Sequence, residues 1–407
     1  MVLSIFDPSP AQAAPRNGLG SRLAGIAKNL AVLLVTLAVL AGCLEVGARL
    51  FTNTPPAIGV RDTVVGKRHR PGFADHVFVE EAGREIFLRF NREGFRGADL
   101  PYDAKPGTHR IAVLGDSFVA AVACDEEDTA VDQLKRLLDG SHPEVGWEVM
   151  NFGVSGSSTG QELALYRQIV ARYRPEIVLC AYYMGNDFAD NSTTLSGGNP
   201  RIYFELDDQG EPVQVPSSLT RRKLSNWLNL HSRFYVWQKR ANNIIRNRTN
   251  QGYFAFSTES SAVLDEAWEL NERLIVTLAE EVERDGGRFV LVLYPDSAQV
   301  HDDRWEAALR GAGDTATDFD REHPERRLVQ IAETHEIPVV TMTEEFRHAA
   351  GGRPAADTPP DEHLYFRGYG HFTPRGHHEA ASAVHRFLAE GEGRPILEAV
   401  LNASRRP

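Results

Sequence analysis

The chain has 407 residues, of which 42% are hydrophobic and 25% are charged, and this composition predicts a globular protein with a large core. Its formal net charge of −12 argues against nucleic acid as a partner, because a phosphate-binding surface needs a basic footprint. The three cysteines, Cys43, Cys124 and Cys180, show no C-x-x-C spacing and cannot all pair. This pattern supports neither a zinc site nor a disulfide framework, and we predict no metal and no cofactor.

The N-terminal region predicts a membrane segment. Residues 1–28 are expected to be a disordered cytoplasmic tail, because the first twenty are rich in Pro, Ala and Ser and lack apolar periodicity. The span is expected at residues 29–48, and it reaches a full membrane length from Ile26 to Ala48 if Lys28 and Glu45 extend their charges to the interfaces. Basic residues that precede it predict a cytoplasmic N-terminus and a main domain on the far side.

Three kinds of N-terminal segment fit this pattern: an uncleaved signal anchor, a cleaved signal peptide, and a lipoprotein signal. The lipoprotein alternative rests on Leu40-Ala41-Gly42-Cys43, which resembles a lipobox. Residues 44–51 continue as apolar, helix-compatible sequence where a lipidated cysteine usually precedes a polar tether, so the anchor is favoured. All three alternatives put the rest of the chain outside the cytoplasm, in the periplasm or at the cell surface.

After the span, residues 49–71 are expected to be a linker. Alternating apolar residues in 76–79 and 86–90, separated by a turn with a glycine, predict a β-hairpin. The core then alternates strands and helices. Strands are expected at 110–114, 147–152, 176–182, 288–294 and 338–342. Helices are expected at about 129–138, 158–172, 262–285, 325–335 and 375–388.

This alternation predicts an α/β fold with a doubly wound, mostly parallel five-stranded sheet flanked by helices and a site at the carboxyl ends of its strands. The catalytic domain is expected to cover residues 72–390, with an insertion at 188–260, and residues 391–407 are expected to be a C-terminal tail.

The insertion combines a small hairpin, expected over 203–215, with a basic helical stretch. Residues 212–258 contain no acidic residue and eight Arg or Lys, and their apolar residues are close to helical spacing. One interpretation is a basic amphipathic surface that meets anionic lipid or glycan, or a lid over the site. The favoured one is a helix packed on the catalytic domain with a solvated basic face.

Four polar blocks carry the chemistry. Ser117 lies in Gly115-Asp116-Ser117-Phe118, directly after an apolar strand. The later blocks are Asn151-Phe152-Gly153-Val154-Ser155-Gly156, Met184-Gly185-Asn186-Asp187 and Gly370-His371-Phe372-Thr373-Pro374. In this order they resemble the SGNH/GDSL hydrolase family, in its membrane-tethered bacterial type, over roughly residues 85–390. The resemblance implies an SGNH-like fold and hydrolysis of ester bonds.

The resemblance also assigns a role to each block. Ser117 is matched to the nucleophile, and its backbone N–H to one donor of the oxyanion hole. Gly156 and Asn186 are matched to the other two oxyanion donors, with Gly153 as the glycine most easily confused with Gly156. His371 is matched to the general base.

One part of the family pattern is absent. The family has an aspartate two or three residues before the histidine, where this chain has Gly368 and Tyr369. Either the enzyme uses a Ser–His dyad, which is slightly favoured, or a carboxylate arrives from elsewhere. The candidate orienting acids on the same loop are Asp357, Asp361 and Glu362, and a backbone carbonyl is a further alternative.

These residues predict a serine-dependent ester hydrolase or O-acyltransferase that acts through an acyl-serine intermediate. Its substrates are expected to be small-molecule or glycan esters of the cell envelope or another extracytoplasmic source, with acetylated glycans as the specific version. The membrane is the other predicted partner, through the N-terminal helix. The alternative is a non-catalytic envelope scaffold that keeps the fold with a degenerate site.

Overall fold

A computed structural model describes residues 19–52, 57–197, 201–215, 220–246, 253–312, 318–367 and 370–403. The chain divides into two units. The first contains residues 1–54 and 232–241, and the second contains residues 55–231 and 242–407. Residues 1–18 of the predicted tail lie outside the described residues.

The first unit contains the long helix α1 (Leu19–Phe51) and the start of α7 (Arg233–Arg246). Within the described part of the chain, Leu23–Phe51 is the one helical stretch that is long and apolar enough to cross a membrane, with a mean hydropathy of 2.4. The helix begins ten residues before the span expected at 29–48 and continues beyond it, so the described part of the predicted tail, residues 19–28, is helical.

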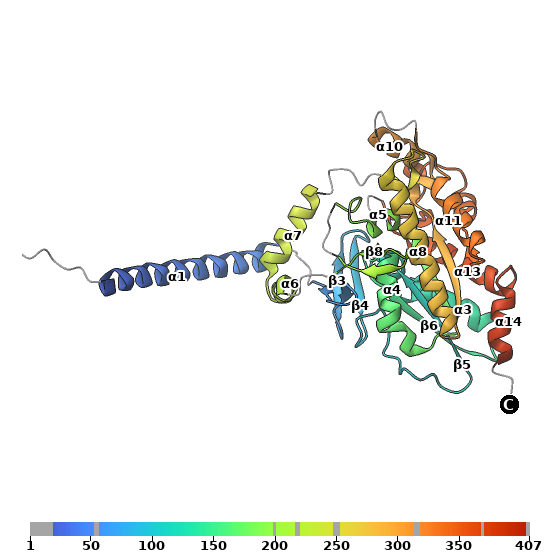
Figure 1. The fold of residues 1–407 in the computed structure, drawn as a ribbon, viewed down its shortest axis with the longest axis horizontal. Helices are drawn as coiled ribbons and strands as arrows, with labels where there is room; N and C mark the ends of the chain where they lie inside the picture. Colours follow the sequence, from blue (N-terminus) through green and yellow to red (C-terminus); the bar gives the residue numbers. More distant parts are fainter. Residues whose placement is uncertain are drawn as a thin grey trace, which may run out of the picture. The chain divides into compact units, whose positions relative to one another are not determined.

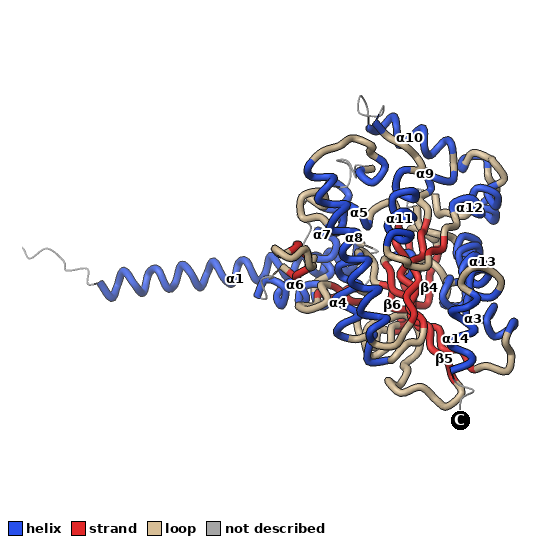
Figure 2. The backbone as a smooth tube through the Cα atoms, turned by 45° about the vertical axis from the view of Figure 1, so that its right-hand side comes forward, coloured by secondary structure: helices blue, strands red, loops and turns tan. Residues whose placement is uncertain are grey.

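A parallel sheet is the centre of the second unit (Figures 1 and 2). Its strands run in the order β11-β10-β7-β5-β6, and every neighbouring pair is parallel. They are β5 (Thr108–Gly115), β6 (Gly146–Gly153), β7 (Ile177–Tyr183), β10 (Arg288–Tyr294) and β11 (Val339–Val340). The predicted fold class, with five parallel strands and flanking helices, is confirmed.

Both faces of the sheet are buried, as the apolar strand sequences require. In β5, Ile111 and Val113 join one hydrophobic cluster, while Ala112 and Leu114 join the other. The helices that supply the cluster of Ala112 are α4 (Thr159–Gln168), α8 (Ala262–Arg284) and α11 (His323–Thr334). Those that supply the cluster of Ile111 are α3 (Ala130–Ser141), α12 (Thr343–Ala350), α13 (Pro374–Ala389) and α14 (Arg394–Ala403). Figure 2 shows the strands between these helices.

Three antiparallel hairpins and several short helices complete the unit. The hairpins are β1–β2 (Gly59–Arg61, Lys67–His69), β3–β4 (Ala74–Val79, Arg84–Arg89) and β8–β9 (Phe204–Leu206, Pro212–Gln214). The remaining α-helices are α2 (Ser117–Ala120), α5 (Asp187–Asn191), α6 (Thr220–His231), α9 (Ser297–Val300) and α10 (Asp302–Ala312). The second and third hairpins lie where the sequence predicted them.

Two segments that were expected to lack regular structure, the linker after α1 and the C-terminal tail, contain strands or a helix. The expected linker, residues 49–71, contains the hairpin β1–β2, and its Val65 and His69 are almost fully buried. The expected tail, residues 391–407, contains α14, whose Leu397 and Val400 are buried in the core. Both segments are too short for their few apolar residues to show a clear period, although those residues do pack.

The strand order fixes where a site can form. From β5 the chain goes to β6 on one side, whereas β7, β10 and β11 follow on the other side. The sheet therefore has its switch point between β5 and β7, and ligands of doubly wound sheets bind beyond the carboxyl ends of the strands at such a point. Ser117 and Asn186 follow these two strands directly.

A substitution at Gly153 tests how closely the end of β6 packs on α2. A Cβ at Gly153 would lie 2.2 Å from the backbone nitrogen of Ala120, so Gly153→Ala should lower the free energy of unfolding by about 2 kcal/mol or more. Gly140→Ala is the matched control, because that glycine is helical with no heavy atom within 4 Å, and alanine there should be neutral or stabilising by up to about 1 kcal/mol. Urea unfolding followed by circular dichroism measures both. Equal stabilities would contradict the close packing.

Candidate active site

Ser117 lies at the first position of α2, immediately beyond the end of β5. The preceding Gly115 allows α2 to fold back on the strand, because a Cβ there would lie 2.4 Å from Cγ2 of Val119. Asp116 caps the short helix, and its Oδ1 accepts a hydrogen bond from the Phe118 N–H at 2.8 Å. The local sequence therefore holds the Ser117 side chain at the end of the sheet, partly exposed.

His371 comes from a tight loop that precedes α13. An isolated bridge pairs Tyr365 with Phe372, and the Phe366 N–H donates to the His371 carbonyl at 2.8 Å. The Phe372 ring is fully buried and lies 4.7 Å from the Phe118 ring. These contacts fix the loop so that His371 Nε2 lies 2.8 Å from Ser117 Oγ.

The carboxylate that contacts His371 is Glu81, which the sequence analysis did not single out. Its Oε1 and Oε2 lie 2.7 and 2.8 Å from His371 Nδ1, and its side chain is 9% exposed. Glu81 belongs to the turn of the hairpin β3–β4. The pair of glutamates at 80 and 81 was visible in the sequence, but no spacing linked it to a histidine 290 residues later.

The three acids expected beside His371 lie elsewhere. Glu362 forms an ion pair with Arg353, and no hydrogen bond or ion pair between described residues joins Asp357, Asp361 or Glu362 to His371. Among the described residues, the carboxylate in contact with His371 is Glu81 and not one of these three. A dyad with no orienting acid, slightly favoured from the sequence, also differs from this geometry. Asp361 and Glu362 belong to a 3-10 helix over Pro360–Glu362, and the hairpin supplies the carboxylate instead.

The electrostatics of His371 follow from this contact. Burial lowers its pKa, but the hydrogen bond and charge of Glu81, with a smaller contribution from Asp116, outweigh burial, so the pKa is raised above its ordinary value. Because a carboxylate only accepts hydrogen bonds, the neutral ring carries its proton on Nδ1. Nε2 is then free to accept the hydroxyl proton of Ser117.

The structure distinguishes the two glycines that follow β6. The Gly153 N–H donates to Asn151 Oδ1 at 2.9 Å, and this glycine packs against α2. Gly156 has a left-handed backbone with φ of +74°, and its N–H has no hydrogen-bond partner among the described residues. A free N–H is what an oxyanion donor requires, so the geometry favours Gly156 over Gly153.

Asn186 follows β7 as the residue before α5. Its Nδ2 donates to Asp190 Oδ2 at 3.1 Å, and Asp190 forms an ion pair with Arg201 at 2.8 Å. Since the Asp190 carboxylate only accepts, this contact sets which way the amide faces. The second Nδ2 proton remains available for a substrate oxygen.

Three buried carboxyl groups hold the turns beneath the site. Asp116 caps α2, Asp187 Oδ2 accepts the Tyr183 N–H at 2.8 Å, and Glu162 Oε1 accepts the Ser157 hydroxyl at 3.4 Å. Burial raises the pKa of all three, that of Glu162 to about 8. The charge of Asp116 contributes to the raised pKa of both Glu162 and Asp187, and the charge of Glu162 contributes to that of Asp187.

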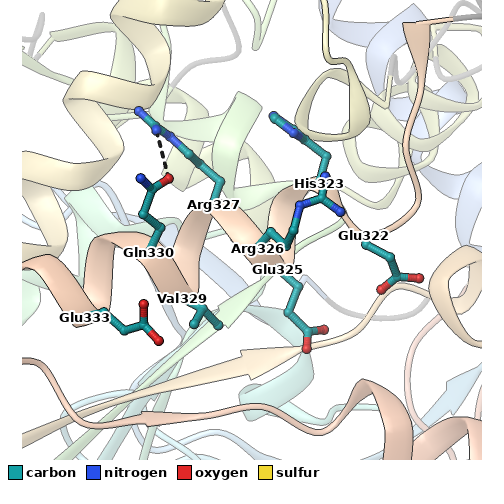
Figure 3. A pocket seen from close by; sticks show the side chains of 8 residues that line it. All are labelled: Glu322, His323, Glu325, Arg326, Arg327, Val329, Gln330 and Glu333. Carbon is teal, nitrogen blue, oxygen red and sulfur yellow. Dashed lines mark hydrogen bonds between the residues drawn. The ribbon is translucent and has the colours of Figure 1, made fainter.

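A separate hollow is lined by residues of α11 and its N-cap. It measures about 560 Å³ and runs along α11, as Figure 3 shows. Its lining residues are Glu322, His323, Glu325, Arg326, Arg327, Val329, Gln330 and Glu333. All of them belong to one helix and its N-cap, and none belongs to the four sequence blocks, so this is the side of a surface helix. Among the described residues no group of His, Cys, Asp and Glu is arranged to hold a metal ion.

The sheet order, the serine–histidine contact and the free Gly156 N–H together match the pattern indicated by the sequence. No protein-family model and no curated protein sequence matches the chain.

Solved structures resemble it weakly. Axe2, an acetylxylan esterase from Geobacillus stearothermophilus, matches as a catalytic mutant with 16% identity and a TM-score of 0.39 over 70% of this chain and 96% of its own. TesA matches with 13% identity and a TM-score of 0.37, over 72% of this chain and 99% of its own. LAE5, an alpha/beta hydrolase from the metagenome of Lake Arreo in Spain, has 14% identity and a TM-score of 0.38, over 73% and 98%. Likenesses of this size carry no argument about activity, which rests on the site itself.

Glu81→Gln tests the carboxylate from the hairpin. Loss of the charge should reduce kcat by up to about 10⁴-fold, as loss of a triad acid does elsewhere. Because Glu81 raises the pKa of His371, the acidic limb of the pH profile of kcat/KM should also move to lower pH. Hydrolysis of p-nitrophenyl acetate between pH 4 and 9 measures both effects. Glu362→Gln and Asp361→Asn are matched controls, and a loss in either that equals the loss in Glu81→Gln would contradict the assignment.

Proposed function

We propose that this protein is a serine-dependent ester hydrolase that acts through an acyl-serine intermediate. The observation that carries the proposal is the chain of contacts from Glu81 to His371 Nδ1 at 2.7 Å and from His371 Nε2 to Ser117 Oγ at 2.8 Å. A nucleophile, a base and a carboxylate in this sequence of hydrogen bonds are the parts of acyl-transfer catalysis.

In the first step, Ser117 Oγ attacks the ester carbonyl carbon while its proton moves to His371 Nε2. The carbonyl oxygen becomes an oxyanion, which the Ser117 and Gly156 backbone N–H groups and the Asn186 amide are proposed to bind. The C–O bond to the alcohol then breaks, and His371 returns the proton to the leaving oxygen. Glu81 holds the ring and stabilises the imidazolium that forms between these events.

In the second step, an acceptor hydroxyl attacks the acyl-serine with the same residues in the same roles. Water as acceptor gives hydrolysis, whereas a sugar hydroxyl gives O-acyl transfer. Ester hydrolysis is the general activity that we propose. O-acyl transfer is a more specific activity that the same residues would also permit.

The N-terminal helix supports an extracytoplasmic site. Arg22 and Lys28 precede the apolar part of α1, a distribution typical of the cytoplasmic side of a membrane helix. A catalytic unit on the other side meets cell-envelope esters, and acetylated glycans are the substrate class we propose for it. The intact Ser117–His371–Glu81 contacts argue against the alternative of a non-catalytic scaffold, and a fluorophosphonate probe that left Ser117 unlabelled would support that alternative.

Ser117→Ala should reduce kcat for p-nitrophenyl acetate by about 10⁴-fold or more, because it removes the atom that forms the covalent intermediate. The fold should remain, since the partly exposed hydroxyl contributes little packing. Ser141→Ala at the end of α3 is the matched control and should retain full activity. A rate near wild type for Ser117→Ala would exclude the mechanism.

Asn186→Ala should reduce kcat by about 10²–10³-fold with little change in KM, because its amide is proposed to bind charge that develops in the transition state. Steady-state kinetics with the same ester separate the two constants. A rise in KM alone would assign Asn186 to substrate binding in the ground state.

A further inference from the structure

The first unit contains a contact between the apolar helix α1 and the start of α7. Glu45 lies near the end of α1, and its carboxylate accepts hydrogen bonds from the backbone N–H groups of Arg233 at 3.0 Å and Phe234 at 3.2 Å. It also accepts the Ser232 hydroxyl at 2.9 Å. A carboxylate at a helix N-terminus is favourable, because it satisfies free N–H groups and opposes the helix dipole. Glu45 therefore fixes the N-terminus of α7 to α1.

The position of Glu45 in α1 sets the level of α7 relative to a bilayer. Lys28 and Glu45 bound the uncharged part of the helix, and they are separated by about 26 Å at 1.5 Å per residue. This length is close to the ~30 Å of a bilayer's hydrocarbon core. If Lys28 lies at one interface, Glu45 lies at the other, and the start of α7 lies at the level of the lipid headgroups.

The side chains at the start of α7 suit that level. The rings of Phe234 and Trp237 stack 5.9 Å apart, and Trp237 is 43% exposed. The Lys239 ammonium lies 5.8 Å from the centre of the Tyr235 ring. Aromatic rings and basic groups in alternation are typical of membrane–water interfaces, where the rings enter the headgroup layer and the cations meet lipid phosphates.

Helix α6, described by itself within the second unit, presents a similar surface. Leu224, Trp227 and Leu230 are 62%, 57% and 39% exposed, and their spacing of three residues gathers them on one side of the helix. Asn226 holds α6 to β1, because its side chain accepts the Arg61 N–H at 2.7 Å and donates to the Arg61 carbonyl at 2.5 Å. The apolar side chains thus point to solvent, contrary to the helix packed by its apolar face that the sequence analysis favoured.

We infer that the docking segment, the stretch of chain over residues 220–241, binds an anionic lipid surface, with α6 and the start of α7 each contacting lipid through the exposed side chains of its own unit. Only Ser232 separates the two helices in the chain. The segment contains Arg221, Arg222, Lys223, Arg233, Lys239 and Arg240 and no acidic residue. This charge complements an anionic bilayer.

Tryptophan fluorescence tests the inference with the full chain. Trp227 and Trp237 are on the segment and α1 contains no tryptophan, so quenching by brominated lipid reports on docking and not on insertion of α1. The full chain is reconstituted in vesicles of phosphatidylcholine and phosphatidylglycerol that contain dibrominated phosphatidylcholine. Trp227→Phe combined with Trp237→Phe should lose at least about half of the quenching seen with the wild type. Trp305→Phe, on α10, is the matched control and should keep it.

The charge of the segment is tested in the same vesicles. Arg233→Gln combined with Lys239→Gln should weaken the increase in quenching that phosphatidylglycerol produces over phosphatidylcholine alone. Wild-type quenching in the double tryptophan variant would overturn the inference. The inference would also be overturned if the chain failed to float with the vesicles. The same holds if Trp227 and Trp237 were unquenched because a dimer buried them. Hydrolysis of p-nitrophenyl acetate by the same samples reports separately on the proposed enzyme activity.

Discussion

The hydrogen bond from His371 Nδ1 to Glu81 joins two distant parts of the chain. One comes before the first strand of the parallel sheet, and the other comes after its last strand. Glu81 is in a hairpin that precedes β5, and His371 is in a loop that follows β11, 290 residues later. The sheet between them must be complete before the two can meet. The contact with Glu81 therefore sets which ring nitrogen of His371 carries the proton and raises the pKa of the ring. This contact requires the folded chain, because its two residues are far apart in the sequence.

Other contacts hold this hairpin in place. Arg84 and Arg89 on β4 form ion pairs of 2.6 Å with Asp125 and Glu126, in the segment that follows α2. The buried Arg96 then donates to the carbonyl oxygens of Ala121 and Cys124, both at 2.5 Å. The exposed pairs contribute little stability each, but the buried guanidinium is costly unless its partners are fixed. The hairpin and the nucleophile's helix are thus positioned by the same set of contacts.

The features that depend on local pattern were predictable from the sequence. The buried strands are continuous apolar runs, the first three blocks follow their carboxyl ends, and the fourth precedes α13, so the sheet, Ser117 and His371 could be located from the order of residues alone. Glu81 could not, because its role depends on a distance in space between two loops, and an acidic turn residue has no pattern of its own. The choice between Gly153 and Gly156 likewise depends on which N–H is already hydrogen-bonded, which no spacing reveals.

The segment expected to be a linker, residues 49–71, also makes contacts beside the site that no sequence pattern indicates. Lys67 on β2 donates to the Ser155 carbonyl at 2.5 Å, and His69 Nε2 lies 3.2 Å from the Ser155 hydroxyl, one residue before the proposed oxyanion donor Gly156. One N-terminal hairpin therefore supports the oxyanion turn and the next supplies the acid to the base. The resemblance noted in the sequence led us to expect an aspartate two or three residues before the histidine, whereas the carboxylate comes from the part of the chain between α1 and β5. Because a triad needs a charge at Nδ1 and not a particular sequence position, this region can replace the missing aspartate, and the site then depends on the whole chain from β1 to α13.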